Sequence, residues 1–483
     1  MFKQFPGKGL SREEVISRLR EMKHDDIDWK RGRVFSLVFY PGDEAANVVH
    51  EAYLMYSMEN GLNPAVFKSL RKMESEVVAF AADLFHAPET AVGNMTSGGT
   101  ESIICAVKAA KHYARTSKNL KGAGNIVMPE SAHPAFNKAA DYLNLEVRTI
   151  HCGTEGLEPD LTQLRSAIDD ETVMVVGSAP AYPHGHIDPI EELSEIALEK
   201  NVWLHVDACV GGFIIPFLEL SGVTMPVFDF RLKGVSSLSA DIHKYGYGPK
   251  GSSIILYRDA EKRKMQFFVY SKWSGGLYIS PTVAGTRPGG AIAGAWAVMN
   301  FLGKEGYIKM AQATHDAVKK IQQAINEQDE ISLVGNPLTT VFSVKSSGKI
   351  DIYRLGDALT ERGWHTDRQL KPPSLHFTVN YVHVNFAEEF IKDLKECIQQ
   401  MKSLSLSNLG ENIQQQLLKT AVKVLPESWI KKMSSRSIEN LPQNTGTPKT
   451  APLYGLAGEL SGSGTLDEMI IDLMENMSKP AKE

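Results

Sequence analysis

The chain contains little cysteine, little net charge and no long apolar run. Its four cysteines, spread over 483 residues without a Cys-x-x-Cys pair, are Cys105, Cys152, Cys209 and Cys397. This spacing excludes a small disulfide scaffold and favours reduced thiols in a reducing compartment. No uncharged apolar run reaches the roughly 18 residues needed to span a bilayer, and the N-terminus lacks the apolar core of a signal peptide. We therefore expect a cytoplasmic protein without a transmembrane anchor.

The charges of the chain nearly balance, with 52 basic and 57 acidic side chains and a net charge of −5. This balance provides neither the basic patch of a nucleic-acid-binding protein nor a general attraction to anionic membranes. Hydrophobic residues make up 43% of the chain and charged residues 23%, which excludes a mainly disordered protein. The length suits a large, two-lobed enzyme.

Short apolar segments alternate with helical segments in the middle of the chain. Strands are expected at 124–128, 146–150, 173–177 and 202–206, and helices at 134–143 and 189–200. This alternation predicts an α/β fold with a mainly parallel central sheet that is covered by helices. In such sheets, ligands bind beyond the carboxyl ends of the strands.

The periodicity changes after about residue 301 and indicates a smaller α/β unit. Helices are expected at 307–327, 352–362 and 387–402, and a strand at 340–345. We therefore predict an N-terminal segment, a large domain, a small C-terminal α/β domain and a polar, partly mobile tail at 1–62, 63–300, 301–403 and 404–483. Within the tail, residues 413–424 could form an amphipathic helix and 466–477 a last helix, while the role of 404–450 is undecided.

Lys244 is the first candidate for a catalytic residue, because it follows His243 in a Gly-bounded loop. Such a lysine could form a Schiff base, which requires a neutral amine. Asp207 stands at the carboxyl end of the apolar strand 202–206. A carboxylate there could hold the protonated pyridine nitrogen of pyridoxal 5′-phosphate (PLP) and keep the ring an electron sink. Taken alone, an Asp that caps the next helix is an equally good interpretation.

Two further elements stand at the same predicted sheet edge. The run Thr96-Ser-Gly-Gly-Thr-Glu-Ser102 precedes a helical stretch, so its amides and hydroxyls could cradle a phosphate. The patterns G-x-x-x-x-G-K-[ST] and G-x-G-x-x-G are both absent. His133 follows a strand and opens a helix, where an imidazole could stack on a cofactor ring. Four such elements in this order are far more specific than any one of them.

The motifs in this order resemble the group II PLP-dependent decarboxylase superfamily and, within it, the sphingosine-1-phosphate lyase family. The motifs are Thr96-Ser-Gly-Gly-Thr-Glu-Ser102, Ser131-Ala-His133, His205-Val-Asp-Ala-Cys-x-Gly-Gly-Phe213 and Ser239-Ala-Asp-x-His-Lys-Tyr-Gly246. The lyase resemblance also includes Asn60-Gly-Leu-Asn-Pro-Ala-Val-Phe67 and Gly275-Gly-Leu-Tyr-Ile-Ser-Pro-Thr-Val-Ala-Gly285. It covers roughly residues 33 to 400 and resumes weakly near Leu453.

The resemblance implies a fold-type I PLP enzyme that works as a homodimer with shared active sites. Lys244 would form the Schiff base, Asp207 would pair with the pyridine nitrogen and His133 would stack on the ring. The remaining residues implied to bind the cofactor are Gly99, Thr100, Cys209, His243 and, reaching the partner's cofactor phosphate, Thr286. Cys209 is equally compatible with the interpretation of a buried, small apolar residue.

The resemblance also implies an activity and a substrate pocket. The activity is retro-aldol cleavage of sphingosine-1-phosphate, or a related phosphorylated sphingoid base, to a long-chain aldehyde and ethanolamine phosphate. The residues implied to line the pocket are Tyr40, Asn60, Tyr182, Lys250 and, from the partner, Tyr278. Lys250 would bind the substrate phosphate, and Tyr278 could transfer a proton. Asn63 stands where the family pattern has a histidine, and we expect none of the N-terminal membrane segment that the eukaryotic enzymes carry.

Three alternative interpretations compete with this one. An amino-acid decarboxylase on the same scaffold would need a cationic group for a carboxylate, and no channel for a long alkyl chain. A non-catalytic relative is disfavoured because Lys244 is retained. The pair His184-Gly185-His186 lacks further metal ligands at suitable spacing, so we expect a loop role and no metal site.

Overall fold

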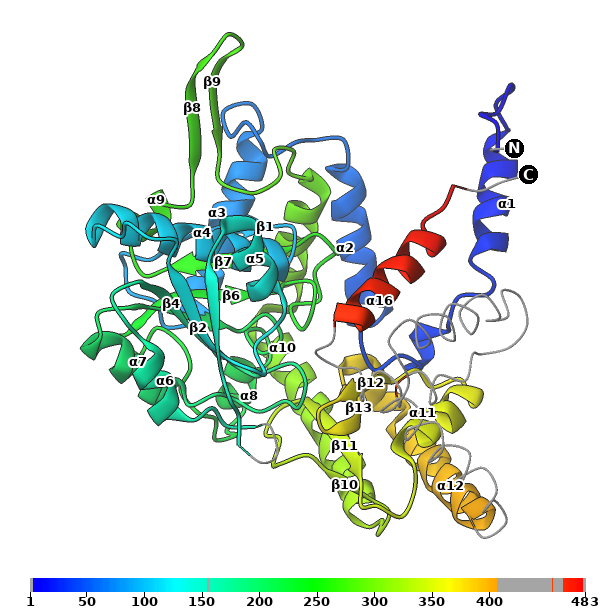
Figure 1. Cartoon of the computed structure of the whole chain (residues 1–483). Helices are drawn as coiled ribbons and strands as arrows, with labels where there is room; N and C mark the ends of the chain where they lie inside the picture. The colour runs from blue at the N-terminus through cyan, green and yellow to red at the C-terminus, as the bar shows by residue number, and fades with distance from the viewer. Residues whose placement is uncertain (1–2, 154–156, 406–453, 455–463, 481–483) are drawn as a thin grey trace.

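The protein was analysed as a computed structural model, which describes residues 3–153, 157–405, 454 and 464–480 (Figure 1). The predicted helix at 413–424 lies outside these ranges, as does all of 404–450 apart from its first two residues. Among the residues described, no helix is long and apolar enough to cross a membrane.

A seven-stranded sheet forms the centre of the molecule, with the strand order β1-β7-β6-β5-β4-β2-β3. Its strands are β1 (Val92–Thr96), β2 (Asn125–Pro129), β3 (Glu146–Ile150), β4 (Thr172–Ser178), β5 (Trp203–Asp207), β6 (Val235–Ala240) and β7 (Ser253–Tyr257). Only the pairings of β7 with β1 and β6 are antiparallel. The prediction of a mainly parallel sheet is therefore confirmed.

Helices cover the sheet (Figure 1). They are α3 (Lys68–Leu84), α4 (Gly99–Ser117), α5 (Ala135–Leu143), α6 (Leu161–Ala167), α7 (Ile190–Glu199), α8 (Ile215–Leu220) and α9 (Ala260–Lys264). Every residue of β2, β4 and β5 is buried, which explains why these strands are apolar throughout instead of alternating.

The strand register brings several carboxyl ends to one sheet edge. Ser178 at the end of β4 pairs with Asp207 at the end of β5, which pairs with Ser239 near the end of β6. Because β1 and β6 both run antiparallel to β7, they run in the same direction, and Thr96 also ends at this edge. The loops that follow β1, β5 and β6 therefore meet there, where a ligand site is expected.

A smaller sheet with the order β10-β11-β13-β12 forms a second unit. Its elements are β10 (Ile331–Leu333), β11 (Val341–Ser346), α11 (Ile352–Glu361), β12 (Asp367–Leu370), β13 (Pro373–Thr378), η2 (Tyr381–Asn385) and α12 (Ala387–Ser405). This unit has its own hydrophobic core, which includes Trp364, Phe377 and Phe390. Phe35, from the N-terminal part of the chain, stacks on Trp364 in the same core.

The long helix α10 (Gly289–Asn326) joins the two units. It is broken at Gly303, whose φ of 56° lies in the left-handed region that favours glycine. Residues on its N-terminal half, such as Ala295 and Val298, belong to the core of the large sheet. Residues near its C-terminal end, such as Val318 and Ile321, belong to the core of the small sheet. The predicted helix at 307–327 is therefore the second half of a kinked helix.

The N-terminal elements are α1 (Arg12–Met22), η1 (Trp29–Arg31) and α2 (Asp43–Met55), and the last described helix is α16 (Gly464–Met477). A capping box between Ser11 and Glu14 begins α1, which buries no residue. In contrast, α2 packs against α10, where Gly290 lies close to Tyr53 and Gly294 close to Val49.

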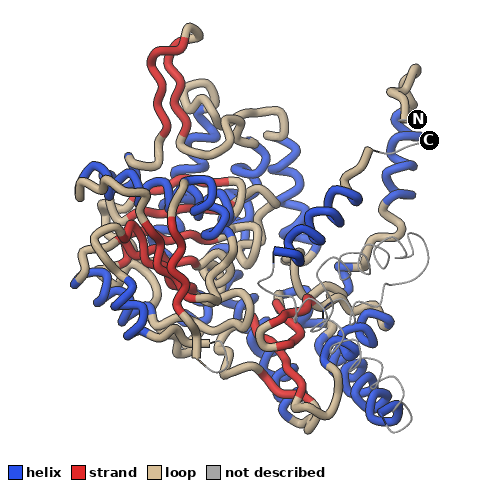
Figure 2. The backbone as a smooth tube through the Cα atoms, in the orientation of Figure 1, coloured by secondary structure: helices blue, strands red, loops and turns tan. Residues whose placement is uncertain are grey.

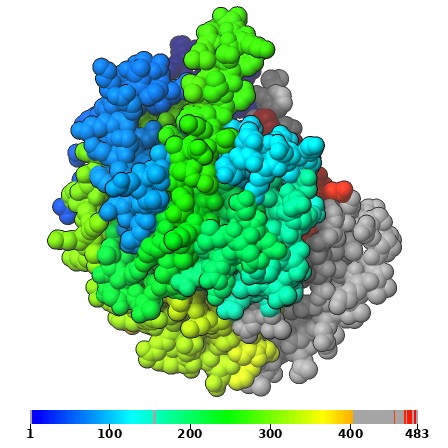
Figure 3. Space-filling view, turned by 90° about the vertical axis from the view of Figure 1, so that its left-hand side faces the viewer, coloured from blue at the N-terminus to red at the C-terminus, as the bar shows by residue number. Residues whose placement is uncertain are grey.

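A hairpin of β8 (Phe268–Trp273) and β9 (Gly276–Ser280) projects from the body of the molecule (Figures 2 and 3). Every residue of β8 is exposed, although the strand contains Phe268, Val269, Tyr270 and Trp273. No pattern in the sequence predicted this hairpin.

Candidate active site

Lys244 and Asp207 lie at the sheet edge described above, in the loops that follow β6 and β5. The Lys244 Nζ is 3.0 Å from Oδ2 of Asp241, and its side chain is 24% exposed. Asp207 is buried, and its Oδ1 accepts a hydrogen bond of 3.0 Å from the backbone N–H of Cys209. The bond fixes the orientation of the Asp207 carboxylate at the strand end. The Cys209 Sγ in turn lies 3.3 Å from the Ser239 hydroxyl.

The charges at this edge influence one another strongly. Burial by itself would lower the pKa of Lys244, but nearby negative charge, that of Asp241 foremost and that of Asp207 in addition, raises it above the usual value. Burial would likewise raise the pKa of Asp241, yet Lys244 and His243 hold it below the usual value. Burial raises the pKa of Cys209 well above that of a free thiol, so this residue stays a neutral thiol.

The predicted phosphate loop lies beside these residues and begins α4. The helix is 19 residues long, and Gly98 at its N-cap provides no side chain to satisfy the first amides. A Cβ at Gly99 would lie 2.8 Å from Cys209 Sγ and 3.0 Å from the Asp241 carboxylate, so only glycine fits there. The exposed side chains of Ser97 and Thr100 flank the loop. This uncapped helix N-terminus is a suitable cradle for a phosphate group.

Glu101 holds the phosphate loop and a second loop together. Its Oε2 accepts a 2.7 Å hydrogen bond from the Ser97 amide. Its Oε1 accepts hydrogen bonds of 2.9 and 3.1 Å from the amides of Val283 and Ala284. The second loop leads to Thr286, so one buried carboxylate positions two segments that are distant in sequence.

Two histidines lie at the same edge. His243 is mostly buried, and its Nδ1 donates to the Ser252 carbonyl at 2.9 Å. Its Nε2 is 3.7 Å from Asp241 Oδ2. His133 is exposed beyond the end of β2, and its Nδ1 accepts a 3.1 Å hydrogen bond from the Ala135 amide. The bond holds the imidazole at the start of α5, and the residue as a whole is exposed.

The predicted substrate-side residues occupy several elements. The Lys250 Nζ donates to the Leu37 carbonyl at 2.7 Å and lies 5.6 Å from the centre of the Phe39 ring. Although the residue as a whole is exposed, burial around the ammonium group and the nearby charge of Lys244 lower the pKa of Lys250 to about 8. Tyr40 donates its hydroxyl to Asp43.

Asn60 and Thr286 lie within hydrogen-bonding distance, at 3.5 Å between the Asn60 Nδ2 and the Thr286 Oγ1. The Asn60 Oδ1 also accepts a 3.0 Å hydrogen bond from the Arg287 amide. Asn63 is exposed and uses its side chain within a local turn, where Oδ1 accepts from the Ala65 amide.

Tyr182 and Tyr278 lie on other elements. Tyr182, in the loop after β4, donates a 3.1 Å hydrogen bond to Asp367 of the small sheet and stacks on His376. Tyr278 lies on the projecting hairpin, with its ring 6.2 Å from Phe268 and 6.4 Å from Trp273. Its hydroxyl lies close to Gly285, where an added Cβ would be 3.3 Å away, so within one chain Tyr278 contacts the hairpin and the loop that follows it.

Sequence reasoning missed Asp241, Ser253 and Glu101 as parts of this site. Asp241 stood inside the quoted motif, three residues before Lys244, but a carboxylate in a loop gives no sign of its partner. Ser253 donates to Asp241 from β7, which the sequence analysis did not predict. Glu101 is also part of a quoted motif, but its role depends on the loop that packs against it.

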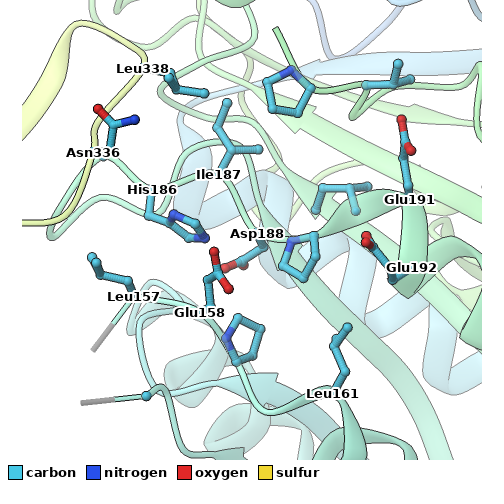
Figure 4. A pocket seen from close by; sticks show the side chains of 17 residues that line it. Leu157, Glu158, Leu161, His186, Ile187, Asp188, Glu191, Glu192, Asn336 and Leu338 are labelled. Carbon is cyan, nitrogen blue, oxygen red and sulfur yellow. The ribbon is translucent and has the colours of Figure 1, made fainter. Parts of the chain in front are cut away.

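A cavity of about 840 Å³ lies elsewhere, between α7 and the small unit (Figure 4). Its walls include Glu158, His186, Asp188 and Glu192, and none of the predicted site residues lines it. His184 points away to the small sheet, where its ring nitrogens contact Ser343 and the Lys371 carbonyl. Within the described ranges, no three His, Cys, Asp or Glu side chains are arranged to hold a metal ion.

Residues 53–345 match the family model of the pyridoxal-dependent decarboxylase conserved domain. Sphingosine-1-phosphate lyase of Oryza sativa is 40% identical over 98% of this chain and 81% of its own length. The lyase of Saccharomyces cerevisiae is 36% identical over 99% of this chain and 76% of its own length.

Solved structures give the same relationship. A sphingosine-1-phosphate lyase of Burkholderia pseudomallei superimposes with a TM-score of 0.80 at 38% identity, covering 86% of this chain and 96% of that one. A glutamate decarboxylase of Lactobacillus brevis, at 21% identity and a TM-score of 0.74 over 83% of this chain and 95% of that one, shares the fold.

The anion cradle at α4, the strand-end carboxylate Asp207 and the accessible amine of Lys244 fit the phosphate, the ring nitrogen and the aldehyde of PLP, respectively. Together with the family match, this fit identifies PLP as the cofactor. The chain belongs to the sphingosine-1-phosphate lyase family of PLP-dependent enzymes.

Proposed function

We propose that this enzyme cleaves phosphorylated sphingoid bases such as sphingosine-1-phosphate to a long-chain aldehyde and ethanolamine phosphate. The observation that carries the proposal is the meeting of Lys244, Asp207 and the α4 cradle at one sheet edge, in a chain that belongs to this lyase family. The bound cofactor supplies an electron sink for the electron pair released when the C2–C3 bond breaks.

The residues proposed to hold the cofactor act through charge and shape. Gly99, Thr100 and His243 hold the phosphate, and the glycine lets the backbone approach it closely. Asp207 keeps the ring nitrogen protonated, while His133 covers one ring face. Cys209 lies beneath the loop as a neutral thiol, since its pKa is raised by burial.

Lys244 is proposed to bind the cofactor aldehyde through its amine. When the substrate amine takes this place, the free Lys244 amine accepts the proton of the C3 hydroxyl. The hydroxyl oxygen then forms the aldehyde carbonyl as the C2–C3 bond breaks. A proton returned to C2, from Lys244 or from Tyr278, completes ethanolamine phosphate.

The substrate pocket is proposed to combine residues of the N-terminal segment with residues of the sheet edge. Lys250 is the cation for the substrate phosphate, and the Leu37 carbonyl orients its ammonium group. Tyr40, Asn60 and Tyr182 line the pocket. Tyr182 is anchored by Asp367, so its ring is held against the small unit.

The enzyme is proposed to be a homodimer in which each site uses residues of both chains. The hairpin supports this, because β8 and β9 expose Leu277, Ile279 and Trp273 to solvent in one chain at 71%, 50% and 55%. Exposed apolar side chains in this density indicate an interface. Tyr278 and Thr286 would reach the partner's site from this region.

The enzyme is also proposed to work in the cytoplasm. The four cysteines are all free and buried, which suits a reducing compartment.

The test incubates the PLP-loaded enzyme with sphingosine-1-phosphate and measures long-chain aldehyde and ethanolamine phosphate by mass spectrometry. Both products are expected, in equal amounts. Glutamate and aromatic amino acids are offered in parallel, with carbon dioxide release as the readout. Release of carbon dioxide without aldehyde would replace the lyase proposal with an amino-acid decarboxylase on the same scaffold.

A further inference from the structure

Asp241 is a buried carboxylate at the end of β6 whose partners all belong to the active site. It is 3% exposed, and its Oδ2 lies 3.0 Å from Lys244 Nζ. Its Oδ1 accepts a hydrogen bond from the Ser253 hydroxyl of β7. Its backbone amide donates to the Cys209 carbonyl at 3.2 Å, so the residue is held from both ends.

The position of Asp241 is closed on the side of the phosphate loop. A Cβ at Gly99 would lie 3.0 Å from both carboxylate oxygens, so the loop backbone passes directly over the side chain. A buried carboxylate without a counter-charge is strongly unfavourable. Lys244 Nζ is the nearer cation at 3.0 Å, whereas His243 Nε2 lies 3.7 Å away and burial lowers the pKa of this histidine.

Other charged groups face Lys244 from the neighbouring elements. Asp207 at the end of β5 favours the protonated amine, as Asp241 does, whereas Cys209 in the following loop is a neutral thiol. Lys250, in the loop before β7, is close enough for its pKa to be lowered by Lys244. Asp241 makes the direct ion pair with Lys244 and precedes it by three residues in the sequence.

We propose that Asp241 is a positioning residue for Lys244, which holds in place the ε-ammonium group that forms when the freed amine takes up a proton beside the cofactor site. The inference rests on the proposed function of Lys244 and deepens it. A lysine that must accept the proton of the substrate hydroxyl needs a high proton affinity at the moment its amine becomes free. The Asp241 carboxylate provides this affinity and keeps the resulting ammonium at a fixed place.

The test uses the whole enzyme freed of its cofactor and measures the reactivity of Lys244. An amine-reactive reagent that modifies only the neutral amine is applied from pH 6 to 11, and peptide mass mapping follows Lys244 with exposed Lys349 as internal reference. In the parent, Lys244 is expected to react only above its usual pKa. In Asp241→Asn, burial acts against a weaker opposing charge, so labelling at pH 8.5 is expected to rise at least about tenfold.

Ser253→Ala is the matched control, because it removes a hydrogen bond to Asp241 and leaves the charge. Its labelling profile is expected to stay close to that of the parent. An Asp241→Asn profile that coincides with the parent profile overturns the proposal. If Asp241→Asn does not fold, the parent enzyme alone still tests the proposal. Half of the Lys244 side chains should then be labelled only at a pH above the usual lysine pKa. A midpoint of labelling at or below that pKa contradicts the proposal.

A separate measurement tests the proposed function of Lys244. Borohydride reduction of the loaded enzyme should attach the cofactor to Lys244. Attachment to another lysine would refute the Schiff-base role of Lys244. The coupling between Asp241 and Lys244 is tested separately, by the labelling profile of the cofactor-free enzyme.

Discussion

The sheet edge and the projecting hairpin differ in how complete they are within one chain. At the edge, Lys244, Asp241 and Asp207 are buried or half-buried, and hydrogen bonds and ion pairs hold them. On the hairpin, apolar side chains such as Leu277 and Ile279 are exposed. Within one chain, the residues of the sheet edge are therefore held by their partners, whereas the apolar side chains of the hairpin are left uncovered.

Replacing Lys244 tests the sheet edge and should have the largest effect on activity. Lys244→Ala removes both the amine and the proton acceptor, so cleavage should fall by at least about 10⁴-fold. Product formation by mass spectrometry measures this loss. Lys349→Ala, on an exposed loop of the small sheet, is the matched control and should retain parent activity. Substantial residual cleavage in Lys244→Ala would contradict the assigned role.

Charged substitutions on the β8–β9 hairpin test the proposed interface. Leu277→Asp with Ile279→Asp should separate the proposed dimer into monomers, because burying these carboxylates in an interface is costly. Activity should fall by about 100-fold, and light scattering after gel filtration measures the mass. A monomer that keeps full activity would refute the shared site.

A mixture of two inactive variants sharpens this test. Lys244→Ala and Tyr278→Phe damage different halves of each site, so mixed dimers should contain one intact site. Exchange of subunits should therefore restore about a quarter of the parent activity. No recovery, with exchange verified, would place Tyr278 in its own chain's site or outside any site.

Replacing Lys250, the residue proposed to bind the substrate phosphate, should have a moderate effect on activity. Its pKa of about 8 means that the ammonium loses its proton as the pH rises above 8. The KM for the phosphorylated substrate should then rise, because the substrate phosphate remains an anion throughout this range. Lys250→Gln should raise KM about tenfold at pH 7. In Lys250→Arg the rise above pH 8 should disappear, and initial rates at several pH values measure both.

The smallest effect concerns the stability of the cofactor-free chain. Lys244→Ala leaves the Asp241 carboxylate buried without its counter-charge, which should cost about 1 to 3 kcal/mol of unfolding free energy. Adding Asp241→Asn should recover most of this loss. Urea unfolding of the two single variants and the double variant measures the coupling, and additive effects would show that the pair does not interact.

The sequence indicated much of the fold, because apolar strands and amphipathic helices have distinct periods. Strands such as 146–150 and helices such as 352–361 lie where they were expected. The strand β7 and the hairpin were missed for different reasons. The strand β7 is only five residues long and follows the Lys244 loop closely, so no element was expected there from the sequence. The hairpin carries apolar residues on both faces, so it lacks the alternation of a half-buried strand.

The order of the motifs predicted which residues would lie at the active-site edge of the sheet, but it did not predict which of their side chains would be in contact. Lys244 and Asp207 lie at the ends of strands whose order in the sheet was unknown from the sequence. The partner of Lys244 turned out to be Asp241, because the turn after β6 folds the lysine back over it. The roles of Tyr278 and Thr286 depend on a second chain, so they stay predictions.

The carboxylate of Glu101 has a consequence for how this site can change during evolution. It accepts hydrogen bonds from the Ser97 amide on one side and from the amides of Val283 and Ala284 on the other. Losing it would leave donors on two separate loops without their acceptor. A lineage that replaces this residue must therefore compensate in both loops, so substitutions at these distant positions should occur together.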